Sequence, residues 1–278
     1  MANAAADRRI VFLGKTGSGK SSLANTIFGV DRLFEVCHSS SSGTMFCKSE
    51  TRGVQGRNVQ LIDTPGLFDT DPNAPDFKKE ILDCIIECAS GVDAFLLVLK
   101  VEKFTKHENA VFEVFCQQFS EEALNYTTVV FTQGDQMEEG ETIKEWIQDN
   151  EPLKTLVQKC GGRCHVFDNK YWKNNQDSYR NNQVQVKALL DTIDQTVEKN
   201  EGRCYTNENL RRVQEKLQEE KAIIRSDPKY ANLSEPEVEQ KAKENIFDYF
   251  WPIFQTFTNW VRALLGSFIW GGKGSKDD

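Results

Sequence analysis

The sequence has no excess of positive charge. Its 278 residues include 34 Lys and Arg against 42 Asp and Glu, which gives a net charge of −8. A protein that works mainly by holding nucleic-acid phosphates needs a basic excess, because its affinity comes from the counterions that its cations release. We therefore expect no nucleic-acid partner. Apolar residues at 39% and charged residues at 27% are typical of a soluble chain with a hydrophobic core.

Targeting signals are also absent. Residues 1–7, which we expect to be a flexible N-terminus, have neither the basic start nor the long apolar run of a signal peptide. Ala2 stands where N-myristoylation requires glycine, and the last residues hold no cysteine for prenylation. None of the 8 cysteines belongs to a set at zinc-ligand spacing. These absences predict a cytoplasmic protein whose cysteines are reduced and serve as small buried apolar residues.

Short apolar runs alternate with segments of helical periodicity over the first two thirds of the chain. The apolar runs, each expected to form a strand, are 9–13, 59–62, 94–99, 128–131 and 163–167. The helical patterns lie at 21–28, 77–89, 108–119, 142–159 and 183–197. This alternation predicts an α/β fold of three layers, in which a mostly parallel central sheet is covered on both faces. We expect this domain to span residues 8–204.

A glycine-rich loop follows the first expected strand and precedes the first expected helix. Gly14-Lys-Thr-Gly-Ser-Gly-Lys-Ser21 fits the P-loop pattern at every fixed position. In a P-loop, glycines let backbone N–H groups turn toward a nucleotide's phosphates, the lysine neutralises the β- and γ-phosphates, and the last hydroxyl binds Mg²⁺. The helix N-terminus adds its dipole. The residues expected to hold the nucleotide here are Gly14, Lys15, Thr16, Gly17, Ser18, Gly19, Lys20, Ser21 and Ser22.

Two further features favour a GTPase over other P-loop proteins. Asp63-Thr-Pro-Gly66 ends the second apolar run, as a metal-side aspartate and a γ-phosphate-sensing glycine would. Between this motif and the P-loop lies Ser39-Ser-Ser-Ser-Gly-Thr44, a polar stretch that can supply the Thr44 hydroxyl to Mg²⁺. We expect Ser21, Thr44 and Asp63 to serve the metal. An ordinary turn at 63–66 and a plain loop around Thr44 are the alternatives, and a P-loop small-molecule kinase is a third.

These motifs resemble those of the immunity-associated nucleotide-binding proteins, the GIMAP or IAN GTPases, which are related to the plastid import (Toc) GTPases and the septins. The resemblance runs from about Arg8 to Lys199. Beyond the P-loop it includes Asp63-Thr-Pro-Gly-Leu-Phe-Asp69, Phe95-Leu-Leu-Val-Leu99 with Lys103-Phe-Thr105, and Cys160-Gly-Gly-Arg163 with Asn169. It implies a P-loop GTPase fold, GTP or GDP with Mg²⁺ as cofactors, and dimers or oligomers that form on GTP.

The resemblance also implies that guanine is selected by the loop after the strand at 128–131. In that loop Thr132, Gln133 and Asp135 are the expected base-binding residues. A carboxylate there can accept hydrogen bonds from guanine N1 and N2, which adenine cannot supply. An alignment shifted by one residue would place Gln136 at the acid position. Asn169 is expected to line the base from the other side, and an ordinary polar loop residue is the alternative.

The sequence holds few groups that would speed hydrolysis. The residue after Gly66 is Leu67, so the glutamine that positions water in Ras-like GTPases is absent. Lys103 stands where some members of the resembling family supply an arginine across a dimer interface, and lysine lacks the bidentate fork of arginine. We expect Lys20, Thr44, Gly66 and Lys103 to carry slow GTP hydrolysis. A GTP-loaded scaffold with essentially no GTPase activity, and Lys103 as a plain surface charge, are the alternatives.

The character of the sequence changes after residue 204. Residues 205–246 form a charged extension, in which apolar positions within 209–226 recur as in an amphipathic helix or a short coiled coil. The segment 247–278 is rich in Phe and Trp. Its apolar side chains would gather on one face of a helix, which favours a helix lying on the surface of an intracellular membrane. A helix that crosses the membrane, or one that packs on the GTPase domain or a partner, are the alternatives.

Overall fold

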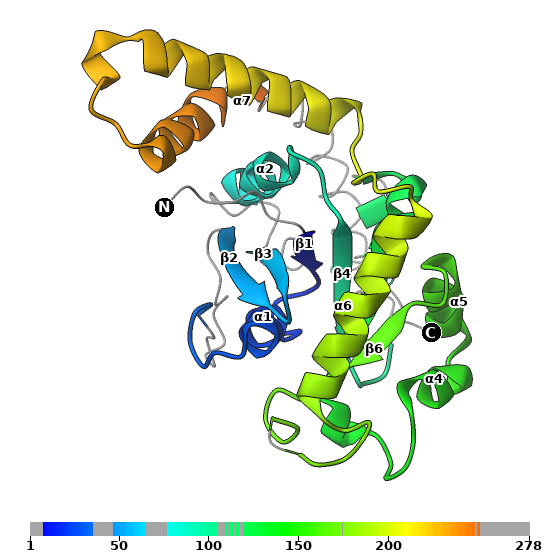
Figure 1. The fold of residues 1–278 in the computed structure, drawn as a ribbon. Helices are drawn as coiled ribbons and strands as arrows, with labels where there is room; N and C mark the ends of the chain where they lie inside the picture. Colours follow the sequence, from blue (N-terminus) through cyan, green and yellow to red (C-terminus); the bar gives the residue numbers. More distant parts are fainter. Residues whose placement is uncertain are drawn as a thin grey trace, which may run out of the picture. The chain divides into compact units, whose positions relative to one another are not determined.

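The computed structural model describes residues 8–35, 47–64, 77–104, 109, 112–113, 115–116, 119–173, 175–247 and 249–250. The chain divides into two compact units, residues 1–70 with 92–205 and residues 71–91 with 206–278. The first unit contains a central β-sheet, and the second contains the helices α2 (Phe77–Cys88) and α7 (Glu208–Ser226) (Figure 1).

Within the described residues, a six-stranded sheet forms the centre of the first unit, in the order β2-β3-β1-β4-β5-β6. The strands are β1 (Arg8–Leu13), β2 (Lys48–Val54), β3 (Arg57–Asp63), β4 (Ala94–Lys100), β5 (Thr127–Thr132) and β6 (Cys164–Val166). β1 pairs in parallel with β3 and β4, and β5 pairs in parallel with β4 and β6. The central strands β4 and β5 are buried almost throughout, as expected for strands covered on both faces. The predicted α/β fold with a mostly parallel sheet is confirmed.

The edge strand β2 is missing from the sequence-based expectation. It contains no apolar run, and Val54 is its one buried residue. β2 pairs antiparallel with β3 across the two-residue turn Gln55–Gly56, in which both φ angles are positive (47° and 80°). Such a turn matches the twist of the two strands that it joins. The hairpin with β3 therefore brings this strand into the sheet, and charged side chains along it discourage pairing at the open edge.

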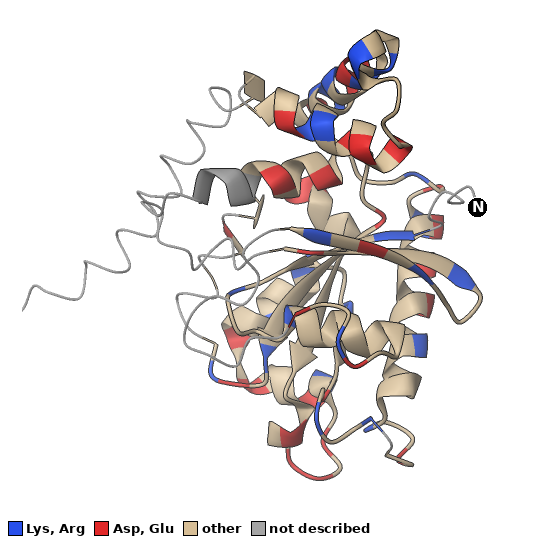
Figure 2. Cartoon of the chain, turned by 90° about the vertical axis from the view of Figure 1, so that its left-hand side faces the viewer, with Lys and Arg blue, Asp and Glu red and all other residues tan. Residues whose placement is uncertain are grey.

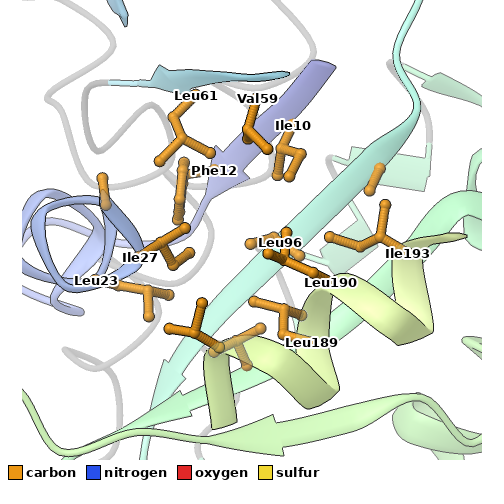
Figure 3. Close-up of a cluster of buried hydrophobic side chains, with 14 of the residues drawn as sticks. Ile10, Phe12, Leu23, Ile27, Val59, Leu61, Leu96, Leu189, Leu190 and Ile193 are labelled. Carbon is orange, nitrogen blue, oxygen red and sulfur yellow. The ribbon is translucent and has the colours of Figure 1, made fainter. Parts of the chain in front are cut away.

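Helices α1 (Lys20–Phe28) and α6 (Asn182–Lys199) cover one face of the sheet. Figure 3 shows their apolar side chains and those of the strands pointing into one core: Leu23, Ile27, Leu189, Leu190 and Ile193 from the helices, and Ile10, Phe12, Val59, Leu61 and Leu96 from the strands. All ten are at most 2% exposed. Because this core holds β1 and α1 against each other, it fixes the ends of the short loop that joins them.

Aromatic side chains gather on the opposite face of the sheet. The ring of Phe95 on β4 lies 5.2 Å from that of Phe115 and 4.9 Å from that of Phe119, between centroids. Both belong to a helical segment that is described at 109, 112–113, 115–116 and 119. Tyr205, 5.5 Å from Phe95, exchanges two backbone hydrogen bonds with Val92. Helical segments thus cover both faces, as the three-layer prediction requires.

The single helix expected over 142–159 is wrong. The structure has α4 (Ile143–Trp146), a 3-10 turn η3 (Ile147–Asp149) and α5 (Glu151–Lys159). Asn150 ends the first part, because its side chain accepts a hydrogen bond from Leu153 N and so starts a new helix with Pro152 in its first turn. Asparagine is a strong N-cap and proline is tolerated only at a helix start, so this pair divides the apolar period into two helices.

In the second unit, α7 and a helix described at 235–247 and 249–250 form an antiparallel pair. The polar contacts between them include Lys221 with Glu239 at 2.9 Å, Asn245 with Glu220 at 3.3 Å, and the Lys216 ammonium 5.4 Å from the ring of Tyr249. The buried apolar residues are Leu210, Val213, Leu217 and Ile224 on α7 and Val238, Ala242, Ile246 and Phe250 on the other helix. Acidic and basic residues are interspersed along these helices (Figure 2). The stripe expected in 209–226 is thus buried, and a coiled coil with a second chain stays a prediction.

Lys243 connects this pair to α2. It forms ion pairs with Glu87 of α2 and, at 3.3 Å, with Glu239. No helix in the part of the chain that the structure describes is both long and apolar enough to cross a membrane. The aromatic segment 247–278 lies outside the described residues except at 247 and 249–250, so the three alternatives for it stay open.

Candidate nucleotide-binding site

The P-loop joins β1 to α1 in a conformation that only glycine allows at two positions. At Gly14 (φ 151°) a Cβ would lie 2.4 Å from the backbone oxygen of Val98. At Gly19 (φ 95°) it would lie 3.1 Å from Thr132 Cγ2. Without side chains at these points, the loop can turn its backbone N–H groups toward an anion. The neighbouring Lys15 and Thr16 are half-buried and Gly17 is exposed, so this part of the loop is open to a ligand.

Lys20 begins α1 and folds back over the loop. Its ammonium donates to Gly14 O at 2.9 Å and to Lys15 O at 3.1 Å, and the residue is only 6% exposed. A buried cation is costly unless it is hydrogen-bonded, and here the loop carbonyls supply the partners. The arrangement holds a positive charge at a helix N-terminus, which is where phosphate groups bind.

Ser18 provides a further sign that the loop is built for a ligand. Its hydroxyl oxygen is buried and has no hydrogen-bond partner among the described residues. Buried polar groups in proteins are nearly always paired, and an exception often marks a binding site. Ser22, one residue after the P-loop motif, is half-buried on the first turn of α1.

A hydroxyl and a carboxylate meet directly after Lys20. Ser21 Oγ donates to Asp63 Oδ2 at 2.6 Å, and Asp63 is buried at the end of β3. Mg²⁺ prefers oxygen ligands, takes few of them from the protein and keeps several waters. The described residues contain no group of three or more His, Cys, Asp and Glu that could hold a metal by themselves. A hydroxyl and a carboxylate next to a phosphate site nevertheless fit Mg²⁺. Thr44 and Gly66 lie outside the described residues.

Thr132 joins the P-loop to the sheet. Its hydroxyl donates to Ser18 O at 2.7 Å and approaches Leu99 O at 3.2 Å, and the residue is 2% exposed. Its own carbonyl accepts a hydrogen bond from Val101 N at 2.9 Å. Thr132 thus braces the phosphate loop against the ends of β4 and β5. Its expected direct contact with the nucleotide stays a prediction.

The expected base-binding loop follows Thr132 directly. Gln133 is exposed and has a positive φ of 62°. Asp135 is also exposed and lies in the 3-10 turn Gly134–Gln136 that follows. Gln136 Nε2 donates to Asp135 Oδ2 at 2.7 Å. A hydrogen bond with Asp168, together with partial burial, raises the pKa of the Asp135 carboxyl above its ordinary value. The side chains at the two candidate acid positions, 135 and 136, are therefore hydrogen-bonded to each other.

Asn169 lies toward α1. Its side-chain oxygen accepts a hydrogen bond from Thr26 Oγ1 at 2.9 Å. Together with Ser22 it lines an open groove of about 1120 Å³ that also reaches Phe34 and Val54. The two predicted nucleotide-binding residues Ser22 and Asn169 are thus in one groove, although they are far apart in the sequence.

Lys103 is exposed in the segment after β4. Its neighbour Glu102 forms an ion pair with Lys15 of the P-loop at 3.0 Å, which draws this segment toward the phosphate loop. Sequence reasoning does not single out Glu102 or the buried Asp168. The only available signal for Asp168 is an acidic residue directly after a buried strand, and that pattern is common in loops.

Comparisons with known proteins agree with this geometry. A family model described as the AIG1 family matches residues 8–223. Immune-associated nucleotide-binding protein 9 of Arabidopsis thaliana is 34% identical over 233 residues, 81% of this chain and 66% of that protein. GTPase IMAP family member 8 of Homo sapiens is 33% identical over 199 residues, 72% of this chain and 29% of that protein. The predicted resemblance is confirmed, and the chain spans less than two thirds of the length of these relatives.

A solved structure shares the fold. Toc33 from Arabidopsis thaliana in complex with GDP and Mg²⁺ matches with a TM-score of 0.50 at 19% identity, over 68% of this chain and 84% of that one. Toc33 in complex with Mg²⁺ and GMPPNP also gives a TM-score of 0.50, at 18% identity, over 68% and 85% of the two chains. This likeness supports the P-loop GTPase fold of the first unit.

Proposed function

The chain belongs to the AIG1 family, and from that premise we propose that it is a guanine-nucleotide-binding protein that holds GTP or GDP with Mg²⁺ at the P-loop. The observation that carries the proposal is the P-loop itself. Two glycines shape the backbone, Lys20 lies over the loop, and the pair Ser21–Asp63 stands beside it. The complexes of Toc33 with GDP or GMPPNP and Mg²⁺ add support from a protein of the same fold.

Each group has a distinct part in this proposal. Backbone N–H groups and Lys20 bind the β- and γ-phosphates, and Ser21 and Asp63 hold Mg²⁺ with help from Thr44. The metal neutralises charge that builds up on the phosphates. Gly66 responds to the γ-phosphate, so that the loops around it differ between GTP and GDP.

Asp135 is the proposed guanine-selecting residue. Its carboxylate is exposed and can accept hydrogen bonds from guanine N1–H and N2–H. In Asp135→Asn the side-chain amide donates, so it fits the C2 carbonyl of xanthine in place of the guanine amine. We expect the variant to lose GDP and to gain xanthosine diphosphate by at least about tenfold each. Unchanged preference for GDP would exclude Asp135 and leave Gln136 as the candidate.

Removing the P-loop lysine tests nucleotide binding as a whole. Lys20→Ala should purify without bound GDP, measured by chromatography of the nucleotide released on denaturation. Lys144→Ala, which removes an exposed lysine of α4, is the control and should retain nucleotide. GDP content in Lys20→Ala equal to that of the wild type would rule out the P-loop assignment. If the wild-type protein binds ATP tightly and does not bind GDP, the small-molecule kinase is favoured instead.

We further propose that GTP drives dimer or oligomer formation and that hydrolysis is slow. Lys103 is exposed and follows Glu102, which pairs with Lys15 of the P-loop. Lysine offers a single positive charge, which stabilises a phosphoryl transition state less well than arginine. The alternative is a nucleotide-loaded scaffold with essentially no turnover. The rate per protomer, measured against protein concentration, separates the two: a rate that rises with concentration supports activation by dimers, and a flat rate near zero with retained GTP supports the scaffold.

The remaining part of the proposal places the protein on the surface of an intracellular membrane. The composition of 247–278 supports it, since Phe and Trp suit the depth of lipid headgroups. Flotation with neutral liposomes tests it, with the full chain against a chain that ends at residue 250 and keeps the α7 helix pair. Flotation of the full chain alone is expected. If neither chain floats with the liposomes, the result would argue that the segment packs on protein.

A further inference from the structure

Asp168 organises the loop that follows β6. The residue is 2% exposed, and its Oδ1 accepts hydrogen bonds from Lys170 N at 2.9 Å and Tyr171 N at 2.5 Å. Its backbone oxygen accepts from Asn182 Nδ2 at 2.7 Å, which ties it to the start of α6. A carboxylate that collects several N–H donors holds its surroundings in one arrangement. Asp168 is therefore fixed in place before any ligand binds.

The other oxygen of Asp168 reaches the base loop. Asp168 Oδ2 accepts a hydrogen bond from Asp135 N at 3.4 Å, across a sequence separation of more than thirty residues. Gly134 N, one residue earlier, donates to Phe167 O at 3.0 Å. Two successive residues of the base loop are thus bound to two successive residues after β6. The backbone of Asp135 is positioned by this contact and not by the turn alone.

Trp172 supports the base loop from behind. A Cβ at Gly134 would lie 2.6 Å from the Trp172 ring, so the loop backbone rests directly on the indole. Trp172 is 3% exposed and packs against the Arg180 guanidinium, 6.0 Å from its ring centroid, and the ring of Tyr179 at 6.4 Å. Since the tryptophan is buried and in close contact with Gly134, the loop backbone at Gly134 has no room to move toward it.

The side chains of Asp135 and Asp168 meet at this point. Asp168 Oδ2 lies 3.4 Å from the backbone N of Asp135, and the interaction between the two carboxyl groups is the largest cause of the raised pKa of Asp135. Two carboxylates in contact cannot both stay charged as easily as one, so the exposed member binds a proton more readily. The charged groups that face Asp135 among the described residues are Asp168 and Lys170, both from the loop after β6.

We propose that Asp168 is the positioning residue of guanine recognition and that it makes guanine-nucleotide binding sensitive to acid. Asp135 accepts N1–H and N2–H of guanine only as a carboxylate. When Asp135 gains a proton from water, its O–H turns to the carboxylate of Asp168, and the base loses its partner. The inference rests on the proposed function, because it requires that Asp135 reads guanine.

The direction of the pH dependence follows from the competition between a proton and guanine for the Asp135 carboxylate. Above the pKa of Asp135 in the free protein, affinity for GDP does not depend on this group. Below it, affinity falls by about tenfold per pH unit, because binding must first displace the proton. A neighbour that raises the pKa of Asp135 moves this fall to higher pH.

The test measures the dissociation constant of a fluorescent GDP, labelled on the ribose, between pH 4.5 and 8. Asp168→Asn keeps an oxygen for the N–H groups of Lys170 and Tyr171 and removes the negative charge. We expect the pH at which affinity falls to move down relative to the wild type. Because the β-phosphate also titrates near pH 6, each variant is compared with the wild type at every pH.

Asp177→Asn is the matched control. Asp177 lies in the same loop and also accepts two backbone N–H groups, from Tyr179 at 2.7 Å and Arg180 at 2.6 Å, but it does not bond to Asp135. Its pH profile should follow that of the wild type. Lys170→Gln is the opposite perturbation: it removes a positive charge that faces Asp135, so its affinity should fall at a higher pH than in the wild type.

The outcomes separate the inference from the function on which it rests. If the wild type binds no GDP at pH 7.5, the proposed function fails and this inference with it. If the wild type binds GDP but Asp168→Asn has an unchanged profile, the inference alone is overturned. Should Asp168→Asn fail to fold by circular dichroism, Lys170→Gln decides: a shift to higher pH supports the inference, and an unchanged profile overturns it.

Discussion

Thr132→Val removes one buried hydroxyl and leaves the shape of the side chain almost unchanged. In the wild type this hydroxyl donates to Ser18 O at 2.7 Å and lies 3.2 Å from Leu99 O, at a residue that is 2% exposed. Valine puts a methyl group at the same place, so Ser18 O loses its donor in the interior. The brace between the P-loop and the end of β4 is lost with it.

The expected loss of stability comes from the Ser18 carbonyl oxygen, which is left without a hydrogen-bond donor. Leaving one buried acceptor unpaired costs about 1–3 kcal/mol, and the shorter contact to Ser18 O accounts for most of it. For a unit of this size each kcal/mol lowers Tm by roughly 2–4 °C. We therefore expect Tm to fall by about 2–12 °C, and GDP affinity to fall as well, because the loop that holds the phosphates loses a fixed point.

Urea unfolding followed by tryptophan fluorescence measures this cost. Thr132→Ser is the control, since it keeps the hydroxyl and loses only the methyl group that lies against Gly19. We expect the valine variant to have a lower midpoint than the serine variant at an unchanged slope. If serine destabilises the protein as much as valine does, the methyl contact and not the hydrogen bond holds the loop, contrary to the role assigned to the hydroxyl.

Three further predictions follow from single contacts. Gly14→Ala brings a Cβ within 2.4 Å of Val98 O and should cost about 2 kcal/mol or more with loss of bound GDP; a variant as stable as the wild type would contradict the packing. Burial lowers the pKa of His165 from 6.5 to about 4, so stability should be full above pH 6.5 and fall by up to about 3 kcal/mol toward pH 4, whereas His165→Gln should flatten this loss. Burial also raises the pKa of Cys160 to about 12, so iodoacetamide at pH 8 should label Cys160 only after unfolding, as mass spectrometry can determine.

Prediction from sequence succeeds where one local pattern is enough. The strands β1, β4 and β5 are apolar runs because both faces of the sheet are covered, and such runs are visible without knowledge of their partners. The strand β2 has no such pattern, because it lies at an edge and is recruited by the hairpin with β3. The end of one helix and the start of the next at Asn150 can be predicted only if the capping preference of asparagine is given more weight than the continuous apolar periodicity.

The site shows the same division. The P-loop is one continuous motif whose chemistry is local, so its residues can be read from the sequence. Asp168 and Trp172 act on Gly134 and Asp135 across more than thirty residues, and their types are ordinary for a loop. Nothing in the motif around Asn169 indicates that its preceding acid is buried against the base loop.

The α/β class, the apolar runs of the central strands, the phosphate loop and the family can all be predicted from the order of the amino acids. These depend on residues that are close in the chain, where periodicity and spacing carry the information. Three contacts become visible only in the folded chain: Thr132 with the P-loop, Ser21 with Asp63, and Asp168 with Asp135. Those pairs come together because parallel strands end at one edge of the sheet, and which side chains meet there depends on register and packing rather than on spacing in the sequence.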